Sequence, residues 1–344
     1  MSLSYRQVAS CCPPAASDVY IFTILPTADR GIVAITSNNH LYLLDSTTLQ
    51  TSHAVTPKNL PKNLTSLVVA DDGCSAICGG VDGLVSIFDV RTRAQIGQFQ
   101  TGKPINVLAC RGNDLAVGSE TVVSVWDRRQ SKPRWQNTEN NDEITALDFH
   151  PLRNNILLSG GDDGLVSIFD TLITEEDDSL LQAVNHGPIH KAGFLGPDEL
   201  YALSSDQNLA LHSLTLDDSD LDKPASDQLG DLRPKVPCEY VIDVFPSGPD
   251  YVTACGSHSH SQVDLVKVRR GIGLDLTRRV VLHGAHGGEI VRSIYVDEQT
   301  GVVFTAGEDG QVAAFRASEG DASSSTPSKT SKSKKHTEGR YRPY

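Results

Sequence analysis

Short alternating apolar segments, bounded by turn residues, recur along most of this chain. The segment CGGVDGLVSIFD at residues 78–89 returns as SGGDDGLVSIFD at residues 159–170, with ten of the twelve positions identical. In each copy a strand of small residues leads into an Asp-Gly turn, and an alternating apolar strand follows it. Alternation with a period of two predicts half-buried β-strands. Asp-Gly predicts a tight hairpin whose two central residues both have positive φ.

Five weaker copies of this hairpin complete the series. The bulky position near the end of each copy is Leu44, Phe88, Trp126, Phe169, His212, Val266 and Phe315. These positions are separated by 44, 38, 43, 43, 54 and 49 residues. A four-stranded propeller blade takes about 40–45 residues, so the spacing predicts seven blades with two insertions. Further apolar strands are expected upstream of the hairpins, for example at residues 64–69, 144–149 and 290–296.

The ends of these hairpins are similar to those of the WD-repeat family. Trp126 and Asp127 form the one intact Trp-Asp pair of the sequence. Its acidic half is kept after three other hairpins, at Asp45, Asp89 and Asp170. The segment LHGAH at residues 282–286 resembles the Gly-His beginning of a family blade. The resemblance covers about residues 18–316 and implies an all-β fold, a seven-bladed WD-repeat β-propeller.

The family's buried hydrogen-bond set joins a His, a Ser or Thr, the Asp of the turn and the Trp. The last blade comes closest to this set, with His286, Thr305 and Asp309, but it has Phe315 in place of the Trp. Because no blade has all four residues, we expect the blades to depend more on apolar packing than on buried polar contacts.

The predicted propeller spans residues 1–317, and residues 318–344 are predicted to form a disordered basic tail. The last clear strand ends near Phe315, so the outermost strand of the seventh blade needs another source. Residues 5–9, with the sequence YRQVA, are the expected supplier. Chain ends that meet in one blade close the ring and cover exposed strand edges.

The formal net charge of −13 argues against broad nucleic-acid binding, which needs a basic face. Two acidic segments are expected to be mobile surface loops. The first is EEDD at residues 175–178, and the second is an insertion that continues to about Pro237 and contains Asp217, Asp218, Asp220 and Asp222. They either contact a basic partner, such as a histone or ribosomal protein, or serve only to keep the surface solvated.

The tail composition bears on location. After Asp321 the chain is rich in Ser, Thr and Lys, and SKK at residues 333–335 is typical of a nuclear import signal or of a solubilising tail. No apolar run is long enough to span a bilayer and no secretory signal is visible, and the odd number of cysteines favours reduced thiols. We expect a nuclear protein that also occurs in the cytoplasm.

Three patterns resemble a phosphate loop, a metal site and a catalytic triad, but none of them is complete or well placed for that chemistry. Residues 97–104 nearly fit a phosphate loop, but Pro104 stands where a Ser or Thr would bind Mg²⁺. His258 and His260 have no further ligand at zinc-like spacing. His286, Asp309 and Ser293 fit blade construction better than a catalytic triad. We therefore expect no enzymatic activity, no cofactor and no metal.

The segment WDRR at residues 126–129 matches a box of WD-repeat substrate receptors of cullin ubiquitin ligases, and FDVR at residues 88–91 is a near copy. In that resemblance Arg129 and Arg91 form ion pairs with the adaptor. The alternative is an ordinary repeat with an exposed arginine. The candidate partner-binding residues are Trp126, Asp127, Arg129, Asp89, Arg91 and Arg292. The turn and strand-entry positions expected on the binding face are Asn39, Asp82, Asp163, Asp309 and Arg292.

The last blade and the tail ending RYRPY resemble the WD repeat-containing protein 89 family in its fungal form. This resemblance implies a nuclear or nucleocytoplasmic propeller. The function expected is a non-enzymatic protein–protein interaction scaffold, as a subunit of a nuclear assembly. The alternatives are a cullin ligase substrate receptor and an escort of a basic nuclear or ribosomal protein. We expect no membrane or small-molecule partner, and nucleic-acid contact only through the tail.

Overall fold

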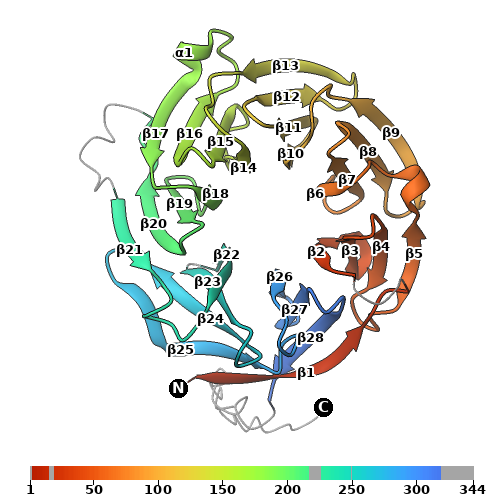
Figure 1. The fold of residues 1–344 in the computed structure, drawn as a ribbon, viewed down its shortest axis with the longest axis vertical. Helices are drawn as coiled ribbons and strands as arrows, with labels where there is room; N and C mark the ends of the chain where they lie inside the picture. Colours follow the sequence, from red (N-terminus) through yellow and green to blue (C-terminus); the bar gives the residue numbers. More distant parts are fainter. Residues whose placement is uncertain (1, 15–18, 217–225, 249, 319–344) are drawn as a thin grey trace, which may run out of the picture.

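The computed structural model describes residues 2–14, 19–216, 226–248 and 250–318, which form a ring of seven four-stranded blades (Figure 1). The described helical segments are one turn of α-helix, α1 (Glu176–Ser179), and two 3₁₀ turns at Ala28–Arg30 and Pro57–Asn59. None of the described helices is both long and apolar enough to cross a membrane. The all-β, seven-bladed prediction is confirmed.

Blades 1 to 5 each use four consecutive strands, which we name a to d from the axis outward. Blades 1 to 3 are β2 (Ile21–Thr27), β3 (Gly31–Thr36), β4 (Leu41–Asp45) and β5 (Thr51–Val55); β6 (Leu64–Ala70), β7 (Ser75–Gly80), β8 (Leu84–Asp89) and β9 (Ala94–Gln100); and β10 (Val107–Arg111), β11 (Asp114–Gly118), β12 (Val123–Asp127) and β13 (Lys132–Asn137). Blades 4 and 5 are β14 (Ile144–Phe149), β15 (Ile156–Gly161), β16 (Leu165–Asp170) and β17 (Leu180–Asn185); and β18 (Ile189–Phe194), β19 (Glu199–Ser204), β20 (Asn208–Ser213) and β21 (Ser226–Asp231).

Blades 6 and 7 share one eight-stranded sheet. Blade 6 is β22 (Tyr240–Ser247), β23 (Asp250–Ser257), β24 (Gln262–Arg269) and β25 (Gly273–His283), and blade 7 has β26 (Val291–Asp297), β27 (Val302–Gly307) and β28 (Val312–Ala317). The fourth strand of blade 7 is β1 (Leu3–Cys11), antiparallel to β28 from Tyr5 opposite Ala317 to Cys11 opposite Val312. This is the position expected for residues 5–9.

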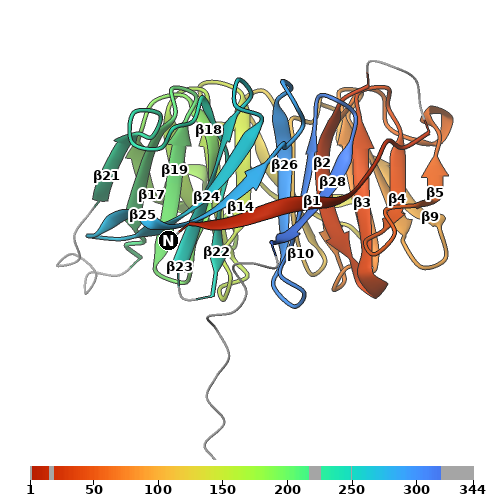
Figure 2. The same cartoon turned by 90° about the horizontal axis from the view of Figure 1, so that it is seen from below.

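The strand β1 also makes a contact that the sequence did not suggest. It lies across the outside of the ring (Figure 2). It also pairs in parallel with the end of β25, the outer strand of blade 6, where Leu3 is opposite Val280 and Tyr5 is opposite Leu282. One strand therefore covers the outer edges of two blades. Because an uncovered strand edge exposes unpaired N–H and C=O groups, this double pairing closes the ring.

The antiparallel strands sort the connections onto two faces of the ring. We call one the a–b face: it carries the turns between strands a and b and between strands c and d. We call the other the b–c face: it carries the turns between strands b and c and the connections from one blade to the next.

Apolar clusters lie between neighbouring blades, and small residues of the b strands make room for them. An added Cβ at Gly79 would lie 2.9 Å from a side-chain carbon of Ile105, which leads into the next blade. The same relation joins Gly118 to Ile144 and Gly160 to Ile189, each at 2.7 Å. The repeated glycines therefore allow a branched side chain of the next blade to pack closely against the b strand.

The hairpin turns differ from the expected type. Gly83 and Gly164 have φ values of 74° and 87°, but the aspartates before them, Asp82 and Asp163, do not have positive φ. The N–H of Gly83 donates to the carbonyl of Gly80 at 3.0 Å, which closes a turn followed by a left-handed glycine. The prediction of two positive φ values was wrong, because a turn with a single left-handed residue also requires glycine at this place.

The two acidic segments are more regular than expected. Within the first, residues 176–179 form α1, and Glu176 accepts a 2.6 Å hydrogen bond from the N–H of Thr138. Within the second, Ser226–Asp231 forms β21, the outer strand of blade 5. The prediction of loops throughout was therefore wrong for these residues. Asp217, Asp218, Asp220 and Asp222 and residues 319–344 of the predicted tail lie outside the described residues.

Candidate functional site

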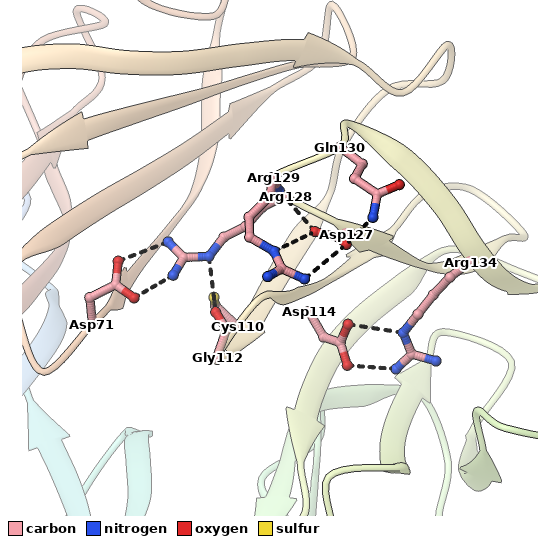
Figure 3. Close-up of polar contacts among 9 residues, drawn as sticks. All are labelled: Asp71, Cys110, Gly112, Asp114, Asp127, Arg128, Arg129, Gln130 and Arg134. Carbon is pink, nitrogen blue, oxygen red and sulfur yellow. Dashed lines mark hydrogen bonds and ion pairs between the residues drawn. The ribbon is translucent and has the colours of Figure 1, made fainter.

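The turn after β12 presents Arg129 outward on the a–b face. Asp127 accepts hydrogen bonds from the backbone N–H of Arg129 at 3.0 Å and from the amide of Gln130 at 3.0 Å (Figure 3). The Arg129 side chain reaches back to the same carboxylate at 3.3 Å and is 65% exposed. Its hydrogen bond is the main cause that holds the pKa of Asp127 below its usual range. The guanidinium is therefore oriented yet open to a partner.

The neighbouring Arg128 contacts another blade. Its side chain is 10% exposed, and its guanidinium makes a two-point contact with Asp71 in the a–b turn of blade 2 (Figure 3). Its Nε donates to the carbonyl of Gly112 at 2.9 Å. This contact lowers the pKa of Asp71. A two-point arginine–carboxylate contact adds geometric specificity, so Arg128 holds blades 2 and 3 together.

Arg134 makes the corresponding tie to blade 4. Its guanidinium contacts both carboxylate oxygens of Asp114, at 2.9 and 2.7 Å (Figure 3). It also donates to the carbonyl of Thr171, after the third strand of blade 4, at 2.9 Å. Neither this tie nor the Arg128–Asp71 tie was found from the sequence. In the latter pair the partners are 57 residues apart. Only the ring geometry brings such turns together.

Trp126 packs within the fold. Its ring stacks on Phe99 of blade 2 with the ring centroids 5.3 Å apart, and its indole N–H donates to the hydroxyl of Ser124 at 2.9 Å. Aromatic pairs at this separation contribute to packing beyond the area that they bury. A role of Trp126 in partner binding stays a prediction, because the ring already joins blades 2 and 3.

The aspartates of the Trp-Asp position share a local role. Asp89 accepts the N–H of Thr92 at 2.6 Å, and Asp45 accepts the N–H groups of Thr47 and Thr48 at 2.9 and 2.8 Å. Each carboxylate thus closes its own c–d turn, as Asp127 does. This explains why the acid persists where the tryptophan is replaced. Arg91, in the turn after Asp89, is exposed.

Arg292 lies on the opposite face from the other candidates. It stands at the beginning of β26, and its Nε donates to Glu308 of the b–c turn at 2.8 Å. The six candidates therefore do not form one site: five belong to c strands and c–d turns, and Arg292 belongs to the b–c face. Their roles in binding stay predictions.

The turn and strand-entry residues expected on the binding face lie on the b–c face, and the structure gives them structural contacts. Asp82 accepts the N–H of Lys62 at 3.0 Å, and Asn39 both accepts from Leu64 N–H at 2.8 Å and donates to the carbonyl of Pro61 at 2.8 Å. They fix the connection between blades 1 and 2. Asp163 likewise accepts the N–H of its own turn, at 3.0 Å.

Blade 7 contains the predicted polar set. His286 Nδ1 lies 2.7 Å from Asp309, and its Nε2 lies 2.8 Å from the hydroxyl of Thr305. Phe315 is fully buried at the position of the family tryptophan. Ser293 instead accepts the N–H of Ile24 at 3.1 Å, which joins blade 7 to blade 1. These contacts account for His286, Asp309, Thr305, Ser293 and Phe315 as parts of the scaffold.

The other chemical patterns also have places in the fold. Residues 97–104 end β9 and lead into blade 3. His258 pairs with Glu239 at 2.7 Å, and His260 Nδ1 lies 2.9 Å from the hydroxyl of Ser257. Among the described residues no group of three or more His, Cys, Asp or Glu side chains is arranged to hold a metal ion.

The central channel is polar on one side and apolar at the a–b end. Lys191 pairs with Asp243 at 2.7 Å, and Asp148 accepts the N–H of Phe194 at 2.8 Å while burial raises its pKa to about 6. At the a–b end, the channel opens into a cavity of about 560 Å³. Its apolar walls come from blades 1 to 4 and include Leu25, Pro26, Leu67, Val69, Leu108 and Phe149.

Comparison with known proteins agrees with this architecture. Residues 132–170 match the family model described as WD domain, G-beta repeat. An uncharacterised WD repeat-containing protein of Schizosaccharomyces pombe is 32% identical over 275 residues, which cover 74% of this chain and 83% of that protein. This chain belongs to the WD-repeat family. WD-repeat proteins in general mediate protein–protein interaction, and this general function holds for the chain.

Two further WD-repeat relatives bear on the narrower resemblance. An uncharacterised WD repeat-containing protein of Saccharomyces cerevisiae is 29% identical over 308 residues, covering 86% of this chain and 78% of that protein. The WD repeat-containing protein 89 homolog of Dictyostelium discoideum is 23% identical over 242 residues, covering 67% of this chain and 65% of that protein. The resemblance of this WD-repeat protein to the protein 89 family is thus supported.

Proposed function

We propose that this WD-repeat protein is a non-enzymatic binding platform for protein partners and works as a subunit of a nuclear assembly. The observation that carries the proposal is the apolar surface of the a–b face. Leu152 and Leu172, in two turns of blade 4 on this face, are each 73% exposed, and the apolar channel opening lies on the same face. Exposed apolar side chains and an apolar opening on the same face favour a protein partner there.

The arrangement of the polar groups supports binding over catalysis. Catalysis needs a reactive group that is free to meet a substrate, with a base oriented toward it. Here His286 contacts Asp309 and Thr305, and Ser293 binds the backbone of blade 1. The groups that most resemble catalytic residues therefore hold the ring together.

A paired substitution tests the a–b face. Leu152→Asp with Leu172→Asp places two charges on that face, and Val81→Asp is the control because Val81 is 42% exposed on the b–c face. Tagged variants and wild type are purified from cells, and co-purifying proteins are quantified by mass spectrometry. We expect the double variant to lose the partners and the control to retain them. Equal retention by both variants would contradict the proposal.

Nuclear location is proposed from the sequence of the tail, and microscopy tests it. The substitutions Lys334→Ala and Lys335→Ala remove two charges from SKK at residues 333–335. If this segment is an import signal, a fluorescent fusion of the variant shifts toward the cytoplasm while wild type stays nuclear. A wild-type fusion excluded from the nucleus would contradict the nuclear assembly.

The exposure of Arg129 favours one second candidate, a substrate receptor of a cullin ubiquitin ligase. Its guanidinium is 65% exposed and is oriented by Asp127. Arg129→Glu is expected to abolish recovery of adaptor subunits, whereas the exposed Arg316→Glu on blade 7 leaves it unchanged. If wild type recovers no adaptor, or both variants recover it equally, this candidate fails.

A further inference from the structure

We infer that the a–b face contains an oxyanion-binding pocket between blades 1 and 2, formed by Arg30, Arg91 and Arg93. Its ligand is a carboxylate or phosphate group on a peptide segment of a partner protein. The inference rests on the proposed function and deepens it, because it names the chemistry by which the platform recognises that segment.

The pocket has a volume of about 280 Å³. One wall is the a–b turn of blade 1, at residues 27–31, together with the end of β4 and Ser52. The other wall is the c–d turn of blade 2, with Val90, Arg91 and Arg93, and Cys74 of the neighbouring turn. One water takes about 30 Å³ of liquid, so the space suffices for a phosphate or a carboxylate with its water.

None of the three guanidinium groups makes a hydrogen bond or ion pair within the described ranges 2–14, 19–216, 226–248 and 250–318. This separates them from Arg128, Arg129 and Arg134 on the same face, each of which contacts a carboxylate. Arginines that line one pocket repel each other, and a planar guanidinium suits two-point contact with carboxylate or phosphate. An anionic ligand relieves this repulsion and uses these donors.

Two acids also line the pocket, and a third, Asp89, lies beside it. The Asp45 carboxylate accepts the N–H groups of Thr47 and Thr48 at 2.9 and 2.8 Å, so it is directed to its own turn. The hydrogen bond from Thr48 is the main cause that lowers its pKa. Asp29 is exposed at the rim. Asp89, which precedes the pocket residues Val90 and Arg91, accepts the N–H of Thr92 at 2.6 Å, and its pKa is lowered mainly by that hydrogen bond and in smaller part by the charge of Arg91. The acids therefore offset the arginine charges without using their hydrogen-bond donors, and an incoming oxyanion would accept from these donors.

Turns of the ring place two of the arginines. Arg30 and Arg93 have φ values of 57° and 60°, and the c–d turn positions equivalent to Arg93, Leu49 and Ser131, have φ values of 56° and 54°. The left-handed backbone at Arg93 therefore belongs to the repeated turn. Arg30 and Arg93 line one pocket although they belong to different blades.

The pocket adjoins the apolar channel opening. Thr27 lines both cavities, and the turn of Asp72 and Gly73 beside the opening continues into Cys74 of the pocket. A bound segment therefore places an apolar side chain in the opening and an anionic group in the pocket. A protein segment fits this combination better than a nucleic acid, because the chain has a net charge of −13.

Fluorescence anisotropy with three labelled peptides tests the inference on the full-length protein. The peptides share a Leu-Leu sequence followed by phosphoserine, glutamate or serine. The phosphoserine and glutamate forms distinguish phosphate from carboxylate as the recognised group. We expect one or both to bind more tightly than the serine form, with weaker binding as salt rises.

The pocket variant is Arg91→Gln with Arg93→Gln, and the control is Arg278→Gln with Arg316→Gln, which removes the same charge at two other exposed positions. We expect the pocket variant to lose about tenfold in affinity for the anionic peptide and the control to change less than about twofold. Melting curves of both variants confirm that each is folded.

Three outcomes overturn the inference: no preference for either anionic peptide, equal loss in both variants, or tighter binding to a labelled single-stranded oligonucleotide that the pocket variant loses. The proposed function is decided separately by Leu152→Asp with Leu172→Asp. If that variant loses its partners while the pocket variant binds the peptides normally, the pocket fails and the binding platform stands.

Discussion

Blades 2 and 4 are the most alike in sequence, and they are also built alike at their inner, b–c ends. Strand a of each begins with a β-bulge, at Thr65 and at Thr145. Both hydroxyls donate to the carbonyl of an isoleucine leading into the next blade, Ile105 or Ile189, at 2.6 Å. A bulge re-aims a side chain, and here it directs the same hydroxyl to the same neighbour in both blades.

The same two blades differ on the a–b face. The c–d turn of blade 2 is short and carries Arg91 and Arg93. The corresponding connection of blade 4 is longer, contains α1 and exposes Leu172. The shared residues thus build the ring, and the differing residues shape one face of it. This contrast supports the a–b face as the surface that sets partner choice, because loops on a rigid frame vary without loss of the frame.

Removing the closing strand should have the largest effect, because blade 7 differs from blades 2 and 4 in taking its outer strand from the other end of the chain. Deleting residues 1–10 removes most of β1, which uncovers β28 and the end of β25. We expect the melting temperature to fall by several degrees in a thermal unfolding assay. Deleting residues 322–344 is the control, and an unchanged melting temperature after the first deletion would contradict the closure.

The repeat and its closure could be predicted because each rests on local sequence. The Asp-Gly hairpins recur with a blade-sized spacing, and a ring whose last strand ends near Phe315 needs one strand from elsewhere. The polar set of His286, Thr305 and Asp309 followed from the resemblance of one blade alone. In each case the residues that determine the feature lie within one or two blades.

The candidate site was less predictable because its contacts join distant turns. The Arg128–Asp71 tie and the pocket of Arg30, Arg91 and Arg93 both depend on which turns the ring places side by side. The sequence singled out Arg91 and Arg129 from one motif, yet the structure gives Arg129 a carboxylate partner and leaves the Arg91 guanidinium open to a ligand. Sequence similarity between two turns did not determine their surroundings.

Glycine substitutions in the duplicated hairpins should separate blades 2 and 4. Gly83 and Gly164 both have positive φ, so alanine is strained at either position. At Gly83 an added Cβ would lie 2.7 Å from the carbonyl oxygen of Lys103, whereas at Gly164 the nearest atom is 3.1 Å away. We expect Gly83→Ala to reduce the free energy of unfolding by about 2–3 kcal/mol and Gly164→Ala by about 1–2 kcal/mol. Urea unfolding measures both, and the reverse order would break the steric argument.

Blade 4 has Asp148 in the channel at the position where blade 2 has Val68. The contribution of this position to the free energy of unfolding should therefore depend on pH in blade 4 and not in blade 2. Burial raises the pKa of Asp148 to about 6, so the folded chain keeps a proton that the unfolded chain loses near pH 4. Stability from this group therefore falls as the pH rises from about 4 to 6 and is constant above that range. Asp148→Asn should gain on the order of 1 kcal/mol over wild type across this range, since the open channel screens the charge. Parallel pH profiles of the two proteins would refute this assignment.

The smallest expected effect tests the likeness of the two blades directly. Thr65→Val and Thr145→Val each remove a hydroxyl that donates to the next blade at 2.6 Å and leave a carbonyl without that donor. We expect each to reduce the free energy of unfolding by about 0.5–1 kcal/mol, and the two losses to be equal within error. Thr→Ser at the same positions keeps the hydroxyl and should restore most of the stability. Unequal losses would show that the repeated geometry conceals different energetics, and the ring-building contacts of the duplicated blades would then have to be considered one by one.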